Sequence, residues 1–206
     1  MTISSENKKQ CIDFPDEIRN PCEKKKETSI HIGEYHATRL PTIIYTLLGS
    51  CVAVCIYDRK KCIGGMNHIL LPGTASINNF EDCARYGVNA MTLLINRIIS
   101  LGGQKNRFAA KVFGGANLLP SIPYEKCVGK KNILFVLNFL SNESIPVISQ
   151  DVGGNDSRKV YFHTDTGDVF LKRTLSIHYQ QIVEQENKAL KRFKKSTDNT
   201  NAIFYY

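Results

Sequence analysis

Residues 45–72 constrain the fold more than any other part of the chain, because they hold three short apolar runs separated by two tight connections. The first connection is a Gly49-Ser50 corner followed directly by Cys51, and the second is a polar turn at residues 58–61. Short apolar runs bounded by such residues are typical of β-strands. We therefore predict strands at residues 42–47, 52–57 and 63–71, with the last two paired across the polar turn.

The rest of the chain shows further strand-like and helix-like patterns. Apolar residues recur every three or four positions between residues 81 and 101, which predicts a helix with one apolar face, ended by a Gly-Gly pair. A second helix is expected at about 131–140, and a weakly amphipathic basic helix from 182 to about 195. Further strands are expected at 30–38, 108–113, 146–151, 158–163 and 168–173. Because the strands gather in clusters around the helices, the pattern favours an α+β fold, a mixed α/β sandwich, over a doubly wound parallel sheet.

The chain is expected to hold one domain between two tails. Residues 1–29 are polar, rich in charge and without hydrophobic period, so we expect a flexible leader there. Residues 30–179 contain the periodic segments and form the predicted domain, which is long enough to bury a hydrophobic core. Residues 180–206 are expected to form a basic C-terminal helix and tail.

Composition argues against several classes of protein. No apolar stretch approaches the roughly 20 residues that a membrane-spanning helix needs, and the first residues lack the apolar core of a signal peptide. We therefore expect a cytoplasmic protein without membrane insertion. The net charge of +8 is scattered mostly over turns without a basic stripe, which argues against nucleic-acid binding. The seven cysteines match no zinc-binding spacing, and nothing in the sequence indicates a metal or an organic cofactor.

Cys51 and His68 are candidate catalytic residues. Cys51 follows the glycine corner, and His68 returns beside it if the strands at 52–57 and 63–71 pair. A cysteine beside an imidazole can form a thiolate–imidazolium pair, which is a strong nucleophile at neutral pH. On spacing alone, however, a buried structural cysteine and a hydrogen-bonded structural histidine are the more common interpretations. Small buried hydrophobic residues are the expectation for Cys55, Cys62, Cys83 and Cys127.

Six blocks of sequence, in order and in spacing, resemble the CheD family of bacterial chemotaxis, the chemoreceptor glutamine deamidases. The blocks are LGSCVAVCIYD, GGMNHILLP, ARYGVNAM, AKVFGGAN, DVGGNDSRKVYF and TGDVFLKR, and the resemblance covers about residues 30–175. It implies two packed β-sheets flanked by helices, similar to the catalytic domain of cytotoxic necrotizing factor deamidases. It also implies a Cys–His–Thr catalytic set of Cys51, His68 and Thr46, although Thr46 is one residue nearer to the cysteine than the threonine of some family members.

The implied substrates are glutamine side chains on the cytoplasmic helices of methyl-accepting chemotaxis proteins, and a CheC-type phosphatase is a further implied partner. By hypothesis, Cys51 attacks the side-chain amide, His68 transfers protons, and Thr46 orients the imidazole. Backbone N–H groups around Gly49 and Ser50 are expected to hold the tetrahedral oxyanion. Two other classes stay open: a thiol peptidase that uses the same pair of side chains, and an adaptor that docks on receptors or on the phosphatase, with catalysis secondary.

Overall fold

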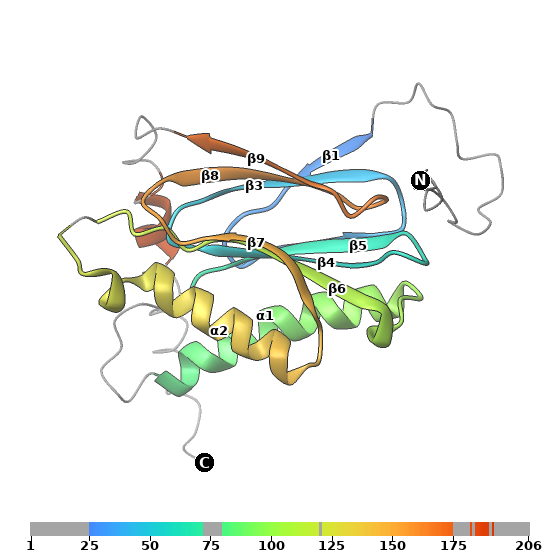
Figure 1. Ribbon diagram of the computed structural model, residues 1–206, viewed down its shortest axis with the longest axis horizontal. Coiled ribbons are helices and arrows are strands. Elements are labelled where there is room, and N and C mark those ends of the chain that lie inside the picture. The colour runs from blue at the N-terminus through green and yellow to red at the C-terminus, as the bar shows by residue number, and fades with distance from the viewer. Residues whose placement is uncertain are drawn as a thin grey trace, which may run out of the picture.

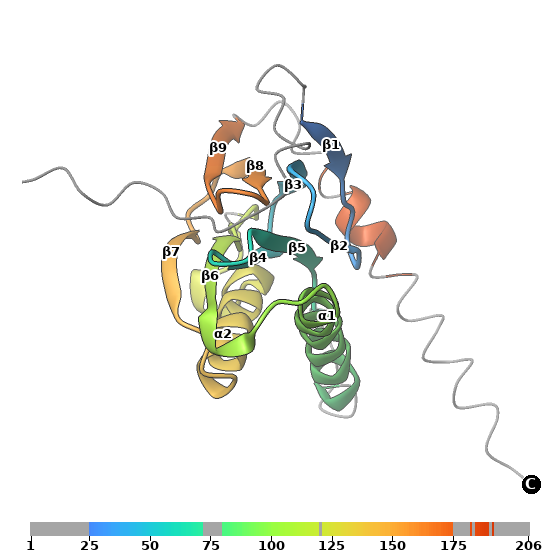
Figure 2. The same cartoon turned by 90° about the vertical axis from the view of Figure 1, so that its right-hand side faces the viewer.

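The computed structural model describes residues 25–71, 80–119 and 121–174, together with residues 182, 184–189 and 191 of a helical segment near the C-terminus. Residues 80–174 and 25–71 form three layers, with helices α1 and α2 on one side, a five-stranded sheet in the middle and a four-stranded sheet on the other side (Figure 1 and Figure 2). This arrangement confirms the predicted α+β sandwich of two packed sheets. Helices α1 and α2 lie on the same face of the five-stranded sheet (Figure 2).

The four-stranded sheet has the order β1-β3-β8-β9, and the five-stranded sheet has the order β2-β5-β4-β6-β7. Neighbouring strands are antiparallel except in the β1–β3 and β6–β7 pairs, which are parallel. The elements are β1 (Lys26–Ser29), β2 (Tyr35–Thr38), β3 (Thr42–Leu48), β4 (Val52–Asp58), β5 (Ile63–Ile69), α1 (Phe80–Ser100), the 3₁₀ turn η3 (Lys105–Arg107), β6 (Phe108–Gly114), the 3₁₀ turn η4 (Tyr124–Lys126), α2 (Val128–Asn142), β7 (Val147–Val152), β8 (Ser157–His163) and β9 (Val169–Thr174).

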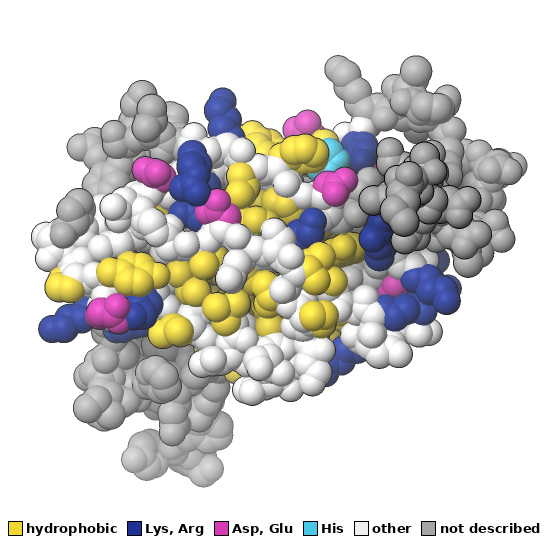
Figure 3. Space-filling view, viewed as in Figure 1, with side chains coloured by type: hydrophobic (Ala, Val, Ile, Leu, Met, Phe, Trp, Pro, Cys, Tyr) yellow, Lys and Arg dark blue, Asp and Glu magenta, His cyan; other side chains and the backbone are white. Residues whose placement is uncertain are grey.

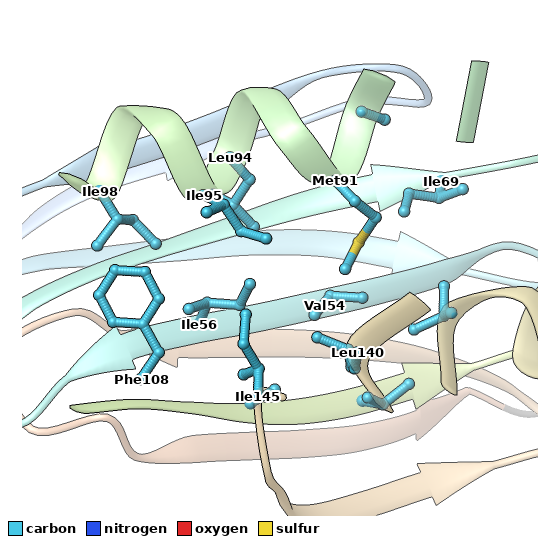
Figure 4. Packing of buried hydrophobic residues seen from close by; sticks show 14 of the residues in the cluster. Val54, Ile56, Ile69, Met91, Leu94, Ile95, Ile98, Phe108, Leu140 and Ile145 are labelled. Atoms are coloured by element: carbon cyan, nitrogen blue, oxygen red, sulfur yellow. The ribbon is translucent and has the colours of Figure 1, made fainter. Parts of the chain in front are cut away.

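The central strands are rich in apolar residues along their whole length because both of their faces are covered. Every residue of β4 and β5 is buried. On one face of this sheet, Met91, Leu94 and Ile98 of α1 pack over Val54 and Ile56 of β4 (Figure 4). In β3, by contrast, buried and half-buried residues alternate, as expected for a strand with one covered face.

A second apolar core fills the space between the two sheets. Ile44 from β3, Met66 from β5 and Phe162 from β8 are fully buried in it. Cys51 and Ala53 belong to the same cluster. The candidate nucleophile therefore lies between the two sheets and not beneath the helices.

The structure differs from the sequence-based expectation at the N-terminal edge of the domain. Lys26–Ser29 were placed in the leader of residues 1–29, but they form β1 and pair in parallel with β3. The strand expected at residues 30–38 is a turn followed by β2, because Gly33 has a φ of 87° and the N–H of Glu34 donates back to the carbonyl of His31. The remaining leader residues, 1–24, and residues 192–206 of the expected tail lie outside the described part of the chain.

Two further expectations concern membrane-spanning helices and a basic stripe on the surface. None of the described helices combines the length and the apolar character needed to cross a membrane. On the face shown in Figure 3, Lys and Arg side chains are scattered among neutral and apolar ones. The positive charge of that face therefore forms separate spots instead of a continuous stripe.

Candidate active site

The corner after β3 carries the chain from one sheet to the other. β3 ends at Leu48 in the four-stranded sheet, and β4 begins at Val52 in the five-stranded sheet, so Gly49, Ser50 and Cys51 bridge the two. The side chain of Cys51 points into the core between the sheets, and the residue is 1% exposed. A connection this short between two sheets fixes the sulfur at the end of the sandwich.

Backbone hydrogen bonds from the segment after β6 hold this corner in place. The N–H of Ala116 donates to the carbonyl of Gly49 at 2.8 Å, and the N–H of Gly115 donates to the carbonyl of Cys51 at 2.7 Å. Gly114 has a φ of 110°, and a Cβ at that position would lie 2.2 Å from the carbonyl oxygen of Cys51. Only glycine allows the strand end to approach the corner so closely.

Asn132 of α2 fixes the remaining carbonyl of the corner. Its Nδ2 donates to the carbonyl oxygen of Ser50 at 2.8 Å, and its Oδ1 accepts from the N–H of Leu71 at 2.9 Å. Asn132 is fully buried. One amide side chain therefore joins the corner, the residues that follow β5, and helix α2. The carbonyls of Gly49, Ser50 and Cys51 thus all accept hydrogen bonds from other parts of the domain. The N–H groups of Ser50 and Cys51 are left to bind another group.

Thr46 fixes the tautomer of His68. The Thr46 hydroxyl donates its single hydrogen to the carbonyl oxygen of Ile30 at 2.7 Å. Its oxygen lies 2.8 Å from Nδ1 of His68, so Nδ1 must be the donor in that contact and must carry the proton. In the neutral ring, Nε2 then has a free lone pair. Nε2 is buried and has no hydrogen-bond partner among the described residues, so in this structure the Cys51 thiol does not donate to it.

Cys51 and His68 lie on the same face of the five-stranded sheet. In the antiparallel β4–β5 pair, Val52 is opposite Ile69 and Ala53 is opposite His68. Because side chains alternate along a strand, residues 51, 53 and 68 all face the second sheet. Cys51 and His68 are therefore diagonal cross-strand neighbours, a pairing whose Cα atoms are typically about 7–8 Å apart. The structure thus brings the two sequence-predicted residues to one side of the sheet.

The closed site favours the neutral forms of both residues. Burial raises the pKa of the Cys51 thiol well above its usual value, and the charge and hydrogen bond of Glu186 raise it further. Burial lowers the pKa of His68 to about 3, with a smaller contribution from His31. The sequence suggested a thiolate–imidazolium pair; in this structure the resting pair is a thiol and a neutral imidazole, because both groups are shielded from water.

Glu186 occupies the corner, a position that no pattern in the sequence predicts. Its Oε1 accepts from the N–H of Ser50 at 2.9 Å and from the N–H of Cys51 at 3.4 Å, and it lies 3.3 Å from Cys51 Sγ. Its Oε2 accepts from the Ser50 hydroxyl at 2.6 Å. Glu186 belongs to the C-terminal helix, defined here as residues 182, 184–189 and 191, drawn in red at one end of the sandwich in Figure 1.

The structure places the five predicted site residues at one end of the sandwich and adds two that were missed. At Gly49 the missing Cβ leaves room for Ile182 and Glu186 of the C-terminal helix. The sequence holds a weak indication that Asn132 is buried, because it shares an otherwise apolar helix face with Val136 and Leu140 at four-residue spacing. It holds no such indication for Glu186, which is one acidic residue in a polar segment.

A buried thiol, an imidazole with a fixed tautomer and two N–H donors that converge on one oxygen are groups suited to the cleavage of amides. The family model described as CheD chemotactic sensory transduction matches residues 70–173 of this chain. Together with the relatives below, this match shows that the chain belongs to the CheD family. The matched range begins after His68 and does not include Cys51, Thr46 or His68.

Curated relatives cover most of the chain. It is 47% identical over 164 residues to the probable chemoreceptor glutamine deamidase CheD 1 of Shewanella oneidensis, covering 79% of each chain. It is 47% identical over 142 residues to CheD 2 of Chromobacterium violaceum, a protein of the same description, covering 68% of this chain and 70% of the relative. It is 37% identical over 193 residues to the CheD protein of Methylobacillus flagellatus, covering 86% of this chain and 95% of the relative.

Proposed function

We propose that this protein is a chemoreceptor glutamine deamidase, which hydrolyses glutamine side chains of chemoreceptors to glutamate and releases ammonia. The observation that carries the proposal is the corner at Cys51, where the thiol and two backbone N–H groups converge on a single carboxylate oxygen. A glutamine side chain has the shape of glutamate with one oxygen replaced by an amino group. Its carbonyl oxygen therefore fits the same position.

The first half of the proposed reaction forms a thioester and releases ammonia. Nε2 of His68 accepts the proton of the Cys51 thiol as the sulfur attacks the amide carbon of the substrate glutamine. The carbonyl oxygen becomes an oxyanion, and the N–H groups of Ser50 and Cys51 stabilise it, each such donor being worth roughly 3 kcal/mol in other enzymes. The imidazolium then gives its proton to the amide nitrogen, the C–N bond breaks, and ammonia leaves.

The second half regenerates the thiol. His68 takes a proton from water, and the resulting hydroxide attacks the thioester carbon. The C–S bond breaks, the proton returns to the sulfur, and the substrate side chain is left as glutamate. Thr46 positions the imidazole throughout, because its contact with Nδ1 holds the ring and leaves Nε2 as the nitrogen that exchanges protons. The balance is one water consumed and one ammonia released for each glutamine.

The proposed setting is the cytoplasm, with the cytoplasmic helices of methyl-accepting chemotaxis proteins as substrates. Its support is the family membership and the relatives that carry the name chemoreceptor glutamine deamidase. A CheC-type phosphatase is a second proposed partner, and calorimetric titration of the purified phosphatase into this protein measures that binding directly.

Incubation of the purified protein with a receptor cytoplasmic fragment tests the function. We expect ammonia release and a mass gain of about 1 Da for each converted glutamine, on intact receptor chains, because replacing NH₂ by OH adds about 1 Da and leaves the backbone whole. Receptor fragments cut in the backbone would identify a peptidase instead. Cys51→Ala should abolish both signals, whereas Cys55→Ala, on the same face of β4, should keep them. Unchanged ammonia release by Cys51→Ala would rule out the thioester mechanism.

A further inference from the structure

The C-terminal helix turns a narrow, regular face toward the corner. Ile182 is 3% exposed and packs with Ala116 and Leu118. Glu186 follows four residues later and contacts Cys51, and Ala189 follows three residues after that and packs against the core between the sheets. A spacing of four and then three residues places all three side chains on one side of a helix. The helix is exposed at its other described positions, 184, 185, 187, 188 and 191.

The carboxylate of Glu186 stands where the reacting group of a substrate must stand. Its Oε1 receives the two corner N–H groups, which is the position of the oxyanion in an amide hydrolysis. Its Oε2 lies 2.6 Å from the Ser50 hydroxyl, which is the position left for the amino group of a glutamine. Cys51 Sγ lies 3.3 Å from Oε1, so the thiol is in hydrogen-bond contact with the carboxylate whose carbon corresponds to the amide carbon of a glutamine.

The absence of a side chain at Gly49 makes room for an aliphatic residue that lies four positions before the residue in contact with Cys51. A Cβ at Gly49 would lie 2.7 Å from Cγ2 of Ile182, 2.5 Å from Cδ1 of Leu118 and 2.9 Å from Oε1 of Glu186. Any side chain at position 49 would therefore push out the aliphatic residue and the carboxylate together. The pocket for Ile182 and the position of Glu186 are thus parts of one surface.

We propose that the C-terminal helix occupies the substrate-helix site of this enzyme as an internal analogue of the product. The inference rests on the proposed function and deepens it, because it assigns a recognition pattern: a helix with glutamine at the reacting position, an aliphatic residue four before it and a small residue three after it. A receptor helix must displace the C-terminal helix to react. Since the analogue belongs to the same chain, it competes at a high effective concentration.

The variant Glu186→Gln converts the analogue into an internal substrate. The amide introduced at position 186 loses ammonia through the Cys51 thioester and gains water, so the encoded glutamate is restored. We expect a mass gain of about 1 Da on the peptide that contains position 186, at a rate independent of protein concentration. Gln185, one residue away and exposed, is the internal control and should stay unchanged. The double variant Cys51→Ala, Glu186→Gln should show no gain.

Two outcomes separate this inference from the proposed function. If Glu186→Gln keeps its amide while the wild-type protein deamidates a receptor fragment, the function stands and the internal analogue is wrong. If neither the amide at position 186 nor the receptor is converted, both are wrong. A conversion rate that rises with protein concentration would show attack between molecules and would contradict an internal analogue.

The recognition pattern is tested within the same chain. Ile182→Asp in the Glu186→Gln background should slow the conversion at position 186 at least tenfold, because a charged side chain cannot enter the pocket beside Gly49. Lys188→Asp in the same background changes an exposed position of the same helix and should leave the rate within about twofold. Equal conversion rates in these two variants would overturn the assigned pattern.

Discussion

Thr46 controls which nitrogen of His68 is available to the thiol. The hydroxyl passes its only hydrogen to the Ile30 carbonyl and must accept from Nδ1. A fixed tautomer matters because a ring protonated at Nε2 has no lone pair there for the Cys51 proton. Thr46 is 3% exposed and lies on the four-stranded sheet, whereas His68 lies on the five-stranded sheet. A single hydrogen bond between the two sheets thus orients the proposed base.

Thr46→Val should lower kcat about tenfold to a hundredfold, the loss seen when the partner that orients a metal-bound histidine is removed. Valine keeps the shape of threonine but neither accepts from Nδ1 nor donates to the Ile30 carbonyl. KM for a receptor fragment should change little, because Thr46 does not belong to the surface that holds the reacting group. Thr46→Ser, which keeps the hydroxyl, should recover most of the activity. A Thr46→Val enzyme with the wild-type kcat would show that the bond does not orient the base.

The buried imidazole should also make the fold sensitive to acid. Burial lowers the pKa of His68 to about 3 in the folded protein, against an ordinary value of 6.5. Between these two values the unfolded chain binds a proton that the folded chain does not, so the free energy of unfolding falls as the pH drops. From pH 7 to pH 5, His68 alone should cost about 2 kcal/mol.

Urea unfolding at pH 7 and pH 5 measures this effect. The loss of stability between the two pH values should be about 2 kcal/mol smaller in His68→Gln than in the wild type, because glutamine binds no proton in this range. Identical losses in the two proteins would mean that His68 is solvated or already charged in the fold.

At the scale of elements, α2 supports the corner through one side chain. Asn132→Ala should leave the carbonyl of Ser50 and the N–H of Leu71 without their partner, at a cost of about 1–3 kcal/mol for each buried group left unsatisfied. The corner then loses one of its three carbonyl contacts, so we expect deamidation to slow about tenfold as well. Asn138→Ala, on the exposed side of the same helix, should change neither property. Thermal unfolding and ammonia release measure the two effects, and equal behaviour of the two variants would contradict the support role.

The elements that local patterns predicted well are the ones whose burial is regular. β4 and β5 are buried throughout, and helix α1 has a continuous apolar face, so apolar runs and helical spacing located them closely. β1 was missed because its sequence, KETS, is polar and its residues are mostly exposed; only pairing with β3 makes it a strand. Pairing between distant segments leaves no periodic signal in such a short edge strand.

The residues of the candidate site also differ in how far local sequence patterns could predict them. Cys51 and its corner carry a local signal, and His68 follows from the pairing of two adjacent strands, so both were found from the sequence and its resemblance to the family. Asn132 and Glu186 reach the corner from segments that are 82 and 136 residues away from Ser50 in the sequence. Their positions depend on how a helix and a C-terminal segment pack, which spacing along the chain does not reveal.

At the scale of the whole molecule, one end of the sandwich collects groups from both sheets and from two helices. Thr46 comes from the four-stranded sheet, His68 from the five-stranded sheet, Asn132 from α2, and Glu186 from the C-terminal helix. Asn132 holds the corner, Thr46 holds the imidazole of His68, and Glu186 contacts the sulfur. The proposed catalytic groups therefore belong to the two sheets and α2, whereas the carboxylate that contacts the sulfur belongs to the C-terminal helix.

Selective alkylation of Cys51 tests whether Glu186 limits access to the sulfur. Burial first, and then the charge of Glu186, raise the pKa of the thiol, so little thiolate forms in the wild type and iodoacetamide should react slowly at pH 8. Glu186→Ala removes the charge and the covering carboxylate, so Cys51 should react at least tenfold faster. Cys55 lies on the same face of β4 and is fully buried away from Glu186, so its rate should stay the same in both proteins. Peptide mass spectrometry after a timed quench gives both rates in one sample. Equal acceleration of Cys51 and Cys55 would indicate that the whole sandwich loosens, and no acceleration would mean that Glu186 does not control access to the sulfur.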